Sequence, residues 1–297
     1  MGWRIVYIEN AMSVKLYLDN IKIIKDTNEV TIPLSDIHTL VIDNQMITIT
    51  VPLINKCSEN NINLIICNIE HLPQSIINPY SGNYQYPIML KKQIEWDEDI
   101  KLLLHQKIIK NKILNQSDLL KSLFLNQDVI NRIVGYSFEV KPGDFENREG
   151  LAAKTYFREL FGKNFKRFED DPINAGLNYG YSILRSQISK TLIAKGLTPC
   201  IGIIHRGAIN PFNLSDDIIE VFRPIIDEFV YKFLKETVIL TRQNRLDIIK
   251  ITGNDAYIKS KRQTIFNTIS IYIDSIIKVF ETNDINYYEE VHLIHEL

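Results

Sequence analysis

Pro79-Tyr80-Ser81-Gly82-Asn83-Tyr84-Gln85-Tyr86-Pro87 is the stretch that divides this chain. It combines two prolines, a glycine and polar turn-forming residues without apolar periodicity, so we interpret residues 79–90 as a linker. Apolar residues before it recur at every second position, whereas apolar residues after it recur with a period of 3.6. The sequence therefore predicts an α+β protein, with a β domain over residues 1–78 and a larger helical domain over residues 91–297.

The amino-terminal region alternates as β-strands do. Val14, Leu16 and Leu18 are separated by Lys15 and Tyr17, and a turn follows directly. Further strands are expected over residues 3–8, 21–24, 30–34, 39–42, 47–51 and 62–67, with a short helix over residues 52–59. This spacing predicts a β-sandwich-like domain or a rolled sheet.

The region after the linker has helical periodicity throughout. Helices are expected over residues 96–115, 117–125, 147–161, 172–195, 215–235 and 261–280. Asp171 precedes Pro172 as an N-cap precedes a first-turn proline, and Gly162 and Gly196 stand where helices should end. We expect this domain to be all-α.

The composition indicates a folded protein in the cytoplasm. Of the 297 residues, 45% are hydrophobic, and no apolar run approaches the roughly 20 residues that span a bilayer. The formal net charge of −2 argues against coating nucleic acid by bulk charge, so any polyanion site must be a local patch. No glycine-rich phosphate loop is present, which argues against nucleotide-driven chemistry.

Glu149 is the first candidate for chemistry. Ala152, Ala153, Tyr156 and Leu160 follow it at helical spacing, which places its carboxylate on the face that packs inward. A buried carboxylate is costly unless it is compensated, and a metal ion is one compensating partner. The alternative is that Glu149 only favours the positive end of the helix dipole.

Three further candidates lie between residues 205 and 220. His205 follows an apolar stretch, where it is either a metal ligand or a hydrogen-bonded core residue. Asp217 and Glu220 are one turn apart and share a helix face, with Ser215 as the expected N-cap. A solvated first turn explains Asp217, but it explains Glu220 less well because apolar residues flank Glu220.

A polar stripe on the helix from Pro172 supports the same region. Asn174, Asn178 and Tyr181 lie on one face beside an apolar face, which suggests hydrogen bonding around a site or a partly exposed helix. One imidazole with two or three carboxylates forms an oxygen-rich ligand set. Such a set suits Mg²⁺ or Mn²⁺ better than structural zinc.

The chain resembles the Cas1 family of CRISPR adaptation integrases, and among them the type II members. The resemblance covers essentially the whole chain, including Asn147-Arg-Glu-Gly150 and Leu214-Ser-Asp-Asp-Ile-Ile-Glu220. The resemblance also rests on residues 2–4, 112–116, 172–181, 196–199, 205 and 221–224. The resemblance implies that Glu149, His205 and Glu220 are catalytic and bind the divalent metal, while Asp217 matches a neighbouring acidic position.

The resemblance also implies partners and a reaction. It implies a homodimer formed through the β domain, a complex with the small Cas2 protein, and insertion of double-stranded protospacer DNA into the CRISPR repeat. A type II effector nuclease and an accessory adaptation protein would take part. In this reaction a DNA 3′-hydroxyl attacks a repeat phosphodiester, and a bound metal assists.

Basic residues beside the proposed ligands are candidates for DNA binding. Arg148, Arg206 and Arg223 adjoin them and would hold phosphates or form structural ion pairs. Lys91, Lys92, Lys163, Lys166 and Arg167 would follow the DNA backbone or lie on a solvated face. Two other functions stay open: a DNA-holding scaffold without catalysis, and a metal-dependent nuclease of branched DNA that uses water as its nucleophile.

Overall fold

The computed structural model describes residues 4–26, 28–77 and 83–295. The chain divides into two compact units, one formed by residues 1–86 and 193–196 and the other by the remaining residues. Strands dominate the first unit and helices dominate the second, which confirms the predicted α+β class. Within the described residues, no helix is both long and apolar enough to traverse a bilayer.

One sheet of the first unit is largely parallel. Its strands follow the order β1 (Arg4–Ile8), β5 (Ile37–Ile42), β7 (Asn63–Cys67) and β8 (Pro73–Ile77). β1, β5 and β7 run parallel, and β8 returns antiparallel to β7. The run Leu64 to Cys67 is almost continuously apolar because strands of a parallel sheet are covered on both faces.

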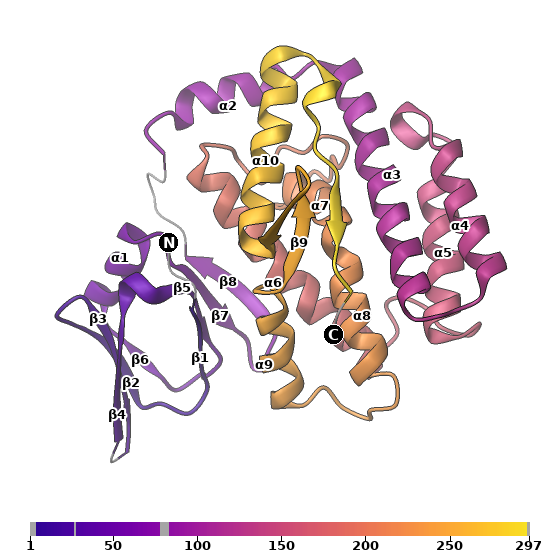
Figure 1. Cartoon of the computed structure of the whole chain (residues 1–297). Coiled ribbons are helices and arrows are strands. Elements are labelled where there is room, and N and C mark those ends of the chain that lie inside the picture. The colour runs from indigo at the N-terminus through magenta and orange to yellow at the C-terminus, as the bar shows by residue number, and fades with distance from the viewer. Residues whose placement is uncertain (1–3, 27, 78–82, 296–297) are drawn as a thin grey trace. The chain divides into compact units, whose positions relative to one another are not determined.

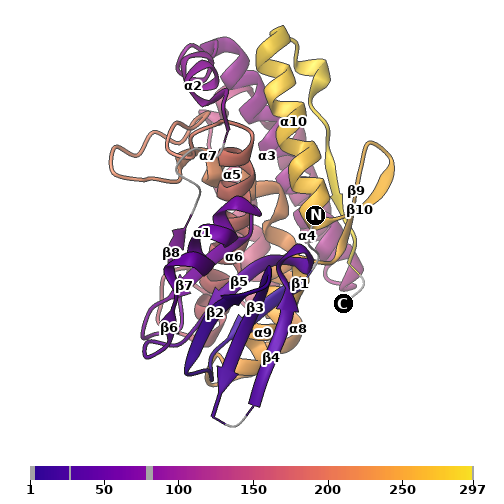
Figure 2. The ribbon, with the colours of Figure 1, turned by 90° about the vertical axis from the view of Figure 1, so that its left-hand side faces the viewer.

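The second sheet of this unit consists mainly of antiparallel strands. It follows the order β4 (Asn28–Pro33), β3 (Asn20–Lys25), β2 (Ser13–Tyr17) and β6 (Thr48–Ile49), and Figure 2 shows β2, β3 and β4 side by side. Apolar side chains of both sheets and of helix α1 (Val51–Glu59) form one core, which includes Val14, Ile21, Leu40 and Leu53. A single turn, η1 (Leu34–Asp36), precedes β5.

The helical unit begins inside the segment predicted as a linker, because residues from Tyr86 onward form helix α2 (Tyr86–Ile94). α3 (Glu98–Ser122) is one continuous helix rather than the two predicted, since no residue near Gln116 breaks its backbone bonding. It packs with α4 (Gln127–Glu139) and α5 (Arg148–Phe161) around a shared apolar core (Figure 1). A turn, η2 (Pro142–Asp144), connects α4 to α5.

The predicted helix over residues 215–235 has three parts. They are α7 (Asn213–Ile219), the 3₁₀ turn η3 (Glu220–Phe222) and α8 (Arg223–Phe233), preceded by the long helix α6 (Pro172–Ala194). Ser215 is not the N-cap, because α7 already begins at Asn213 and the buried Ser215 hydroxyl lies 2.8 Å from that of Ser189. The 3₁₀ turn begins at Glu220 and so determines where that buried carboxylate lies.

The expectation of an all-α domain is wrong in one part. β10 (Lys261–Thr264), β9 (Asp255–Ile258) and β11 (Val291–Leu293) form a three-stranded antiparallel sheet in the second unit. Strands this short are stabilised by packing against a helix rather than by their own sequence pattern. Helix α10 (Ile265–Thr282) contacts β9 and β10. Helix α9 (Arg242–Ile251) precedes β9 in the chain, and the turn η4 (Ile285–Tyr287) precedes β11.

Candidate metal centre

Glu149 lies in the first turn of α5, on a tightly capped helix start. The Asn147 side chain accepts a hydrogen bond from the Gly150 N–H at 3.1 Å, and the Asp144 carboxylate accepts from the N–H groups of Arg148 and Glu149, both at 2.9 Å. These acceptors satisfy three backbone donors that the helix itself cannot. Glu149 therefore does not serve as the cap, and its carboxylate, 31% exposed, is available for another partner.

Glu220 is buried at the junction of α7 and α8. Its Oε1 lies 2.9 Å from a guanidinium nitrogen of Arg223, and its Oε2 forms an ion pair with Lys112. Burial by itself would raise the pKa of Glu220, but Arg223 and Lys112 outweigh burial and lower that pKa to about 2. Glu220 is therefore a carboxylate at neutral pH, available to a cation.

Lys112 joins the two proposed acidic ligands. This residue of α3 is buried, and its ammonium lies 2.5 Å from Glu149 Oε1 while it also contacts Glu220. Burial opposes the charged form, but Glu149 and Glu220 raise the pKa of Lys112 above its ordinary value. The structure thus brings Glu149 and Glu220, which are far apart in sequence, to one positive charge.

His205 is held by Asp217. Nδ1 of His205 lies 2.7 Å from Asp217 Oδ1, and the same carboxylate accepts from the backbone N–H groups of Ile203, Ile204 and His205. An Nδ1–H donated to Asp217 leaves the lone pair of Nε2 for a metal, as in many carboxylate–histidine–metal sites. The hydrogen bond to Asp217 raises the pKa of His205, burial opposes the rise, and the carboxylate of Glu220 adds to it.

His105 is a nearby group that the sequence analysis did not identify. It lies in α3 two turns before Lys112, and its Nδ1 is buried and makes no hydrogen bond to any described residue. Burial lowers the pKa of His105, and the Glu149 and Asp217 carboxylates oppose that effect. The sequence pattern could have identified both α3 residues, because His105 and Lys112 are polar side chains at positions that the helical period assigns to the buried face.

Asn174 and Asn178 face Arg167 rather than the acidic cluster. Both side-chain oxygens accept hydrogen bonds from the Arg167 guanidinium, at 2.9 Å for Asn178. Asn174 also bonds to the Asp171 carboxylate at 2.6 Å and to the Lys166 carbonyl at 2.9 Å. These contacts hold the turn before α6 together.

Tyr181 points to the buried carboxyl of Asp227. Its hydroxyl donates to Asp227, and so does that of Tyr156 at 2.8 Å. The ring of Tyr181 lies beneath the guanidinium of Arg223, 4.6 Å from its centre. Tyr181 therefore supports the arginine that pairs with Glu220.

The three arginines predicted to hold DNA differ in their surroundings. Arg148 pairs with Glu139 at 3.0 Å and Glu146 at 2.8 Å, and Arg206 pairs with Glu98. Arg223 instead lines a pocket of about 270 Å³. The other residues lining this pocket are Arg167, Asn178, Tyr181, Ser182, Arg185, Asp216 and Ile219. Three guanidinium groups in one pocket make it attractive to phosphate.

The other basic candidates lie mostly in ion pairs or in solvent. Lys92 pairs with Glu281 and Lys166 with Glu169, each at 3.1 Å. Lys91 and Lys163 are exposed. Lys163 borders a pocket that Arg132, Lys154 and Arg158 also line together with one acid, Glu159, so the lining is basic on balance.

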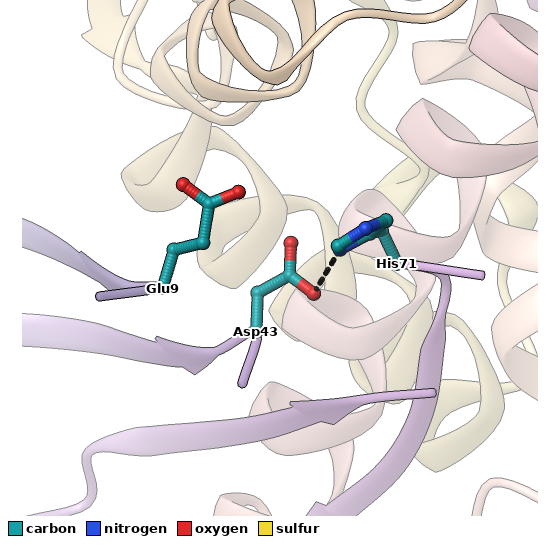
Figure 3. A group of neighbouring side chains, drawn as sticks. All are labelled: Glu9, Asp43 and His71. Atoms are coloured by element: carbon teal, nitrogen blue, oxygen red, sulfur yellow. Dashed lines mark hydrogen bonds and ion pairs between the residues drawn. The ribbon is translucent and has the colours of Figure 1, made fainter. Parts of the chain in front are cut away.

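A separate acid–imidazole group lies in the first unit (Figure 3). Glu9 follows β1, Asp43 follows β5 and His71 lies between β7 and β8, and one ligand atom of each is within 4.8 Å of the others. These side chains are able to bind a metal ion, and the sequence analysis did not predict them. Asp43 is already satisfied, because one oxygen accepts from Tyr7 and the other lies 2.8 Å from Nδ1 of His71.

Lys112 joins the carboxylates of Glu149 and Glu220, and the charge of Glu220 also acts on His205. Among the described residues, the ligand atoms of Glu149, His205 and Glu220 do not all lie within 4.8 Å of one another. By type, two carboxylates and one imidazole form a donor set that suits Mg²⁺ or Mn²⁺. Glu220 Oε2 is buried and receives no hydrogen bond from a described residue. It is stabilised there by its ion pair with the Lys112 ammonium. The fold and this cluster define a two-unit α+β protein whose helical unit contains two acids joined by a buried lysine.

The chain belongs to the Cas1 family of CRISPR-associated proteins. The family model described as "CRISPR associated protein Cas1" matches residues 6–247. The CRISPR-associated endonuclease Cas1 of Neisseria meningitidis serogroup C is 37% identical over 227 residues, which cover 76% of this chain and 74% of the relative.

Two solved structures share the fold. A casposase bound to its integration product superposes with a TM-score of 0.76 at 19% identity, covering 95% of this chain and 91% of that one. A chain of a Cas6-RT-Cas1–Cas2 complex superposes with a TM-score of 0.73 at 17% identity, covering 100% of this chain and 36% of that one.

Proposed function

We propose that the protein is a metal-dependent DNA integrase that joins the 3′-hydroxyl ends of protospacer DNA to phosphodiesters of a CRISPR repeat. One observation carries the proposal: Glu149 and Glu220 meet at the buried ammonium of Lys112, and the charge of Glu220 acts on the imidazole of His205, which Asp217 orients. Membership of the Cas1 family supports the same function. The Neisseria relative is named an endonuclease, and the casposase is described with its integration product.

Glu149, His205 and Glu220 would hold Mg²⁺ or Mn²⁺. When bound, the cation would supply Lewis-acid chemistry, lowering the pKa of the attacking hydroxyl and neutralising charge on the phosphate. Asp217 fixes the ring of His205 so that Nε2 is directed away from the carboxylate. Arg223 keeps Glu220 ionised and offers the rest of its guanidinium to a DNA phosphate.

The reaction exchanges one phosphodiester for another. The incoming 3′-oxygen forms a bond to phosphorus and releases its proton, while the bond from that phosphorus to the 3′-oxygen of the repeat strand breaks and the departing oxygen takes up a proton. The bond energy is conserved, so no nucleotide is consumed. A phosphate-binding loop for ATP is accordingly unnecessary.

The partners that we propose rest on membership of the Cas1 family. We expect double-stranded DNA as the substrate, a homodimer formed through the β unit, and Cas2 as the protein partner. The neighbour solved as a Cas6-RT-Cas1–Cas2 complex supports the Cas2 partner. A type II effector nuclease and an accessory adaptation protein remain predictions of the resemblance.

Strand transfer tests this proposal. A labelled duplex with free 3′-hydroxyl ends is incubated with a repeat-containing plasmid in Mn²⁺, and joined products are separated from nicked ones. Glu149→Gln, His205→Gln and Glu220→Gln should each abolish joining while circular dichroism stays unchanged. Glu281→Gln, a substitution of an exposed helical acid paired with Lys92, is the matched control and should retain activity.

The products decide between the remaining functions. Cut but unjoined strands would identify a nuclease that uses water. DNA binding that is equal in Mn²⁺ and in chelator, without cutting or joining, would identify a scaffold. Full joining by any of the three site variants would remove that residue from the site.

A further inference from the structure

Lys112 occupies the position between the two acidic ligands. Its Nζ lies 2.5 Å from Glu149 Oε1 and is paired with Glu220 Oε2, and its side chain is only 9% exposed. Glu149 comes from α5 and Glu220 from η3, so the ammonium of α3 links three separate segments. An ammonium is a compact positive charge with three donors, which suits two carboxylates at once.

The lysine offsets a repulsion that the site would otherwise contain. Glu220 is buried and Glu149 is 31% exposed, and two carboxylates in such a partly buried site destabilise each other unless a cation lies between them. Arg223 pairs with the other oxygen of Glu220, Oε1. Among the described ion pairs, Arg223 forms none with Glu149. Lys112 is thus the group through which the two acids are joined.

A divalent cation would need the same carboxylate oxygens. A cation held by Glu149 and Glu220 would compete with the Lys112 ammonium for the carboxylate oxygens that the ammonium now contacts. Two positive groups on the same oxygens repel each other strongly in a buried site. Lysine suits an exchange because its four-carbon chain is flexible and its head is a single point charge.

We propose that Lys112 is a positioning residue that keeps the metal-free site assembled and that must leave the carboxylate oxygens when the metal binds. The inference rests on the proposed function, because it takes Glu149 and Glu220 as metal ligands. It has two consequences. Without metal, removal of the ammonium destabilises the protein, and with metal, removal of the ammonium strengthens metal binding, since the ion no longer displaces a competitor.

The test compares Lys112→Met with the wild type and with Lys101→Met. Lys101 is the matched control because it lies in the same helix, has the same 9% exposure and pairs with a single acid, Glu98, at 2.8 Å. Mn²⁺ affinity is measured from the electron paramagnetic resonance signal of free Mn²⁺, and melting temperature is measured in chelator and in Mn²⁺. Lys112→Gln, which keeps a polar side chain, repeats both measurements.

Lys112→Met should bind Mn²⁺ about ten-fold more tightly than the wild type. In chelator its melting temperature should be lower than that of the wild type, and Mn²⁺ should raise its melting temperature by more. Lys101→Met should bind Mn²⁺ as the wild type does. Equal or weaker affinity in folded Lys112→Met and Lys112→Gln would overturn the inference, and so would variants that stay unfolded in saturating Mn²⁺. Wild-type Mn²⁺ binding that Glu149→Ala leaves unchanged would instead count against the proposed function.

Discussion

Asp217 Oδ1 lies 2.7 Å from Nδ1 of His205, and the two oxygens of this carboxylate also accept hydrogen bonds from three consecutive backbone N–H groups. One acid thereby fixes both the ring of the proposed ligand and the loop that carries it. Asp217 is almost fully buried, so its charge is directed at these partners rather than at solvent. We propose that Asp217 positions His205 rather than serving as a metal ligand itself.

Asp217→Asn should reduce Mn²⁺ affinity and strand transfer by about 10- to 100-fold, the usual cost of losing a partner behind a metal-binding histidine. The melting temperature should also fall, because the amide is a weaker acceptor for the loop N–H groups. Metal titration and differential scanning calorimetry measure the two effects. Asp118→Asn, at an exposed helical acid paired with Lys121, should change neither. Unchanged metal affinity in Asp217→Asn would contradict the positioning role.

Arg223→Gln should weaken DNA binding and lower the slope of log K against log salt by about one, as expected for one lost phosphate contact. Its loss also removes a charge that holds the buried Glu220 ionised. Arg206→Gln is the comparison, since Arg206 is 65% exposed and pairs with Glu98. Fluorescence anisotropy of labelled DNA, measured over a series of salt concentrations, gives the DNA affinity of each variant and its salt dependence. A larger loss for Arg206→Gln would place the phosphate contact elsewhere.

Asp227→Asn should remove a pH dependence of stability. Burial raises the pKa of Asp227 to about 6 from its ordinary 3.8, with the tyrosine hydroxyls opposing the rise. Between these values the folded protein keeps a proton that the unfolded chain has lost. The free energy of unfolding therefore falls with rising pH, by about 3 kcal/mol in total for this group.

Urea unfolding from pH 4 to pH 7 measures this effect. The difference between wild type and Asp227→Asn isolates the contribution of this carboxyl from that of other acids. A constant difference across the range would show that Asp227 titrates normally in the folded protein.

Gly180→Ala should destabilise the protein by about 1 to 3 kcal/mol through overpacking. A Cβ at Gly180 in α6 would lie 2.4 Å from Cγ2 of Ile226 in α8, and α8 begins at Arg223, directly after the turn of Glu220. Gly135→Ala in α4 is the control, because its Cβ would meet no atom within 4 Å and alanine favours helix. Thermal melts should therefore shift in opposite directions. A stabilised Gly180→Ala would show that α6 and α8 separate easily.

The sequence predicted the division of the fold better than its details. The change from a period of two to 3.6 around residues 79–90 identified a β part and a helical part because that pattern follows directly from burial. β9 and β10 were missed because residues 255–264 are mostly polar and pair only through tertiary contacts. The Ser215 cap was wrong because a cap-forming residue can equally bond a neighbouring helix, here through Ser189.

The candidate site was partly predictable for a similar reason. Glu149 and Glu220 stood out as charges on apolar helix faces, and the structure brings both to Lys112. Lys112 and His105 were overlooked because periodicity shows that a polar residue is buried but not which distant acid it meets. Asn174 and Asn178 were grouped with the acids by helix face, whereas the structure directs them to Arg167.

Anomalous diffraction at the manganese edge, from crystals grown with Mn²⁺, tests the central claim most directly. We expect one strong peak within ligand distance of Glu149, His205 and Glu220, with the Lys112 ammonium moved away from the carboxylate oxygens. A peak only at Glu9, Asp43 and His71, or no peak in crystals of protein that is active in Mn²⁺, would contradict the account.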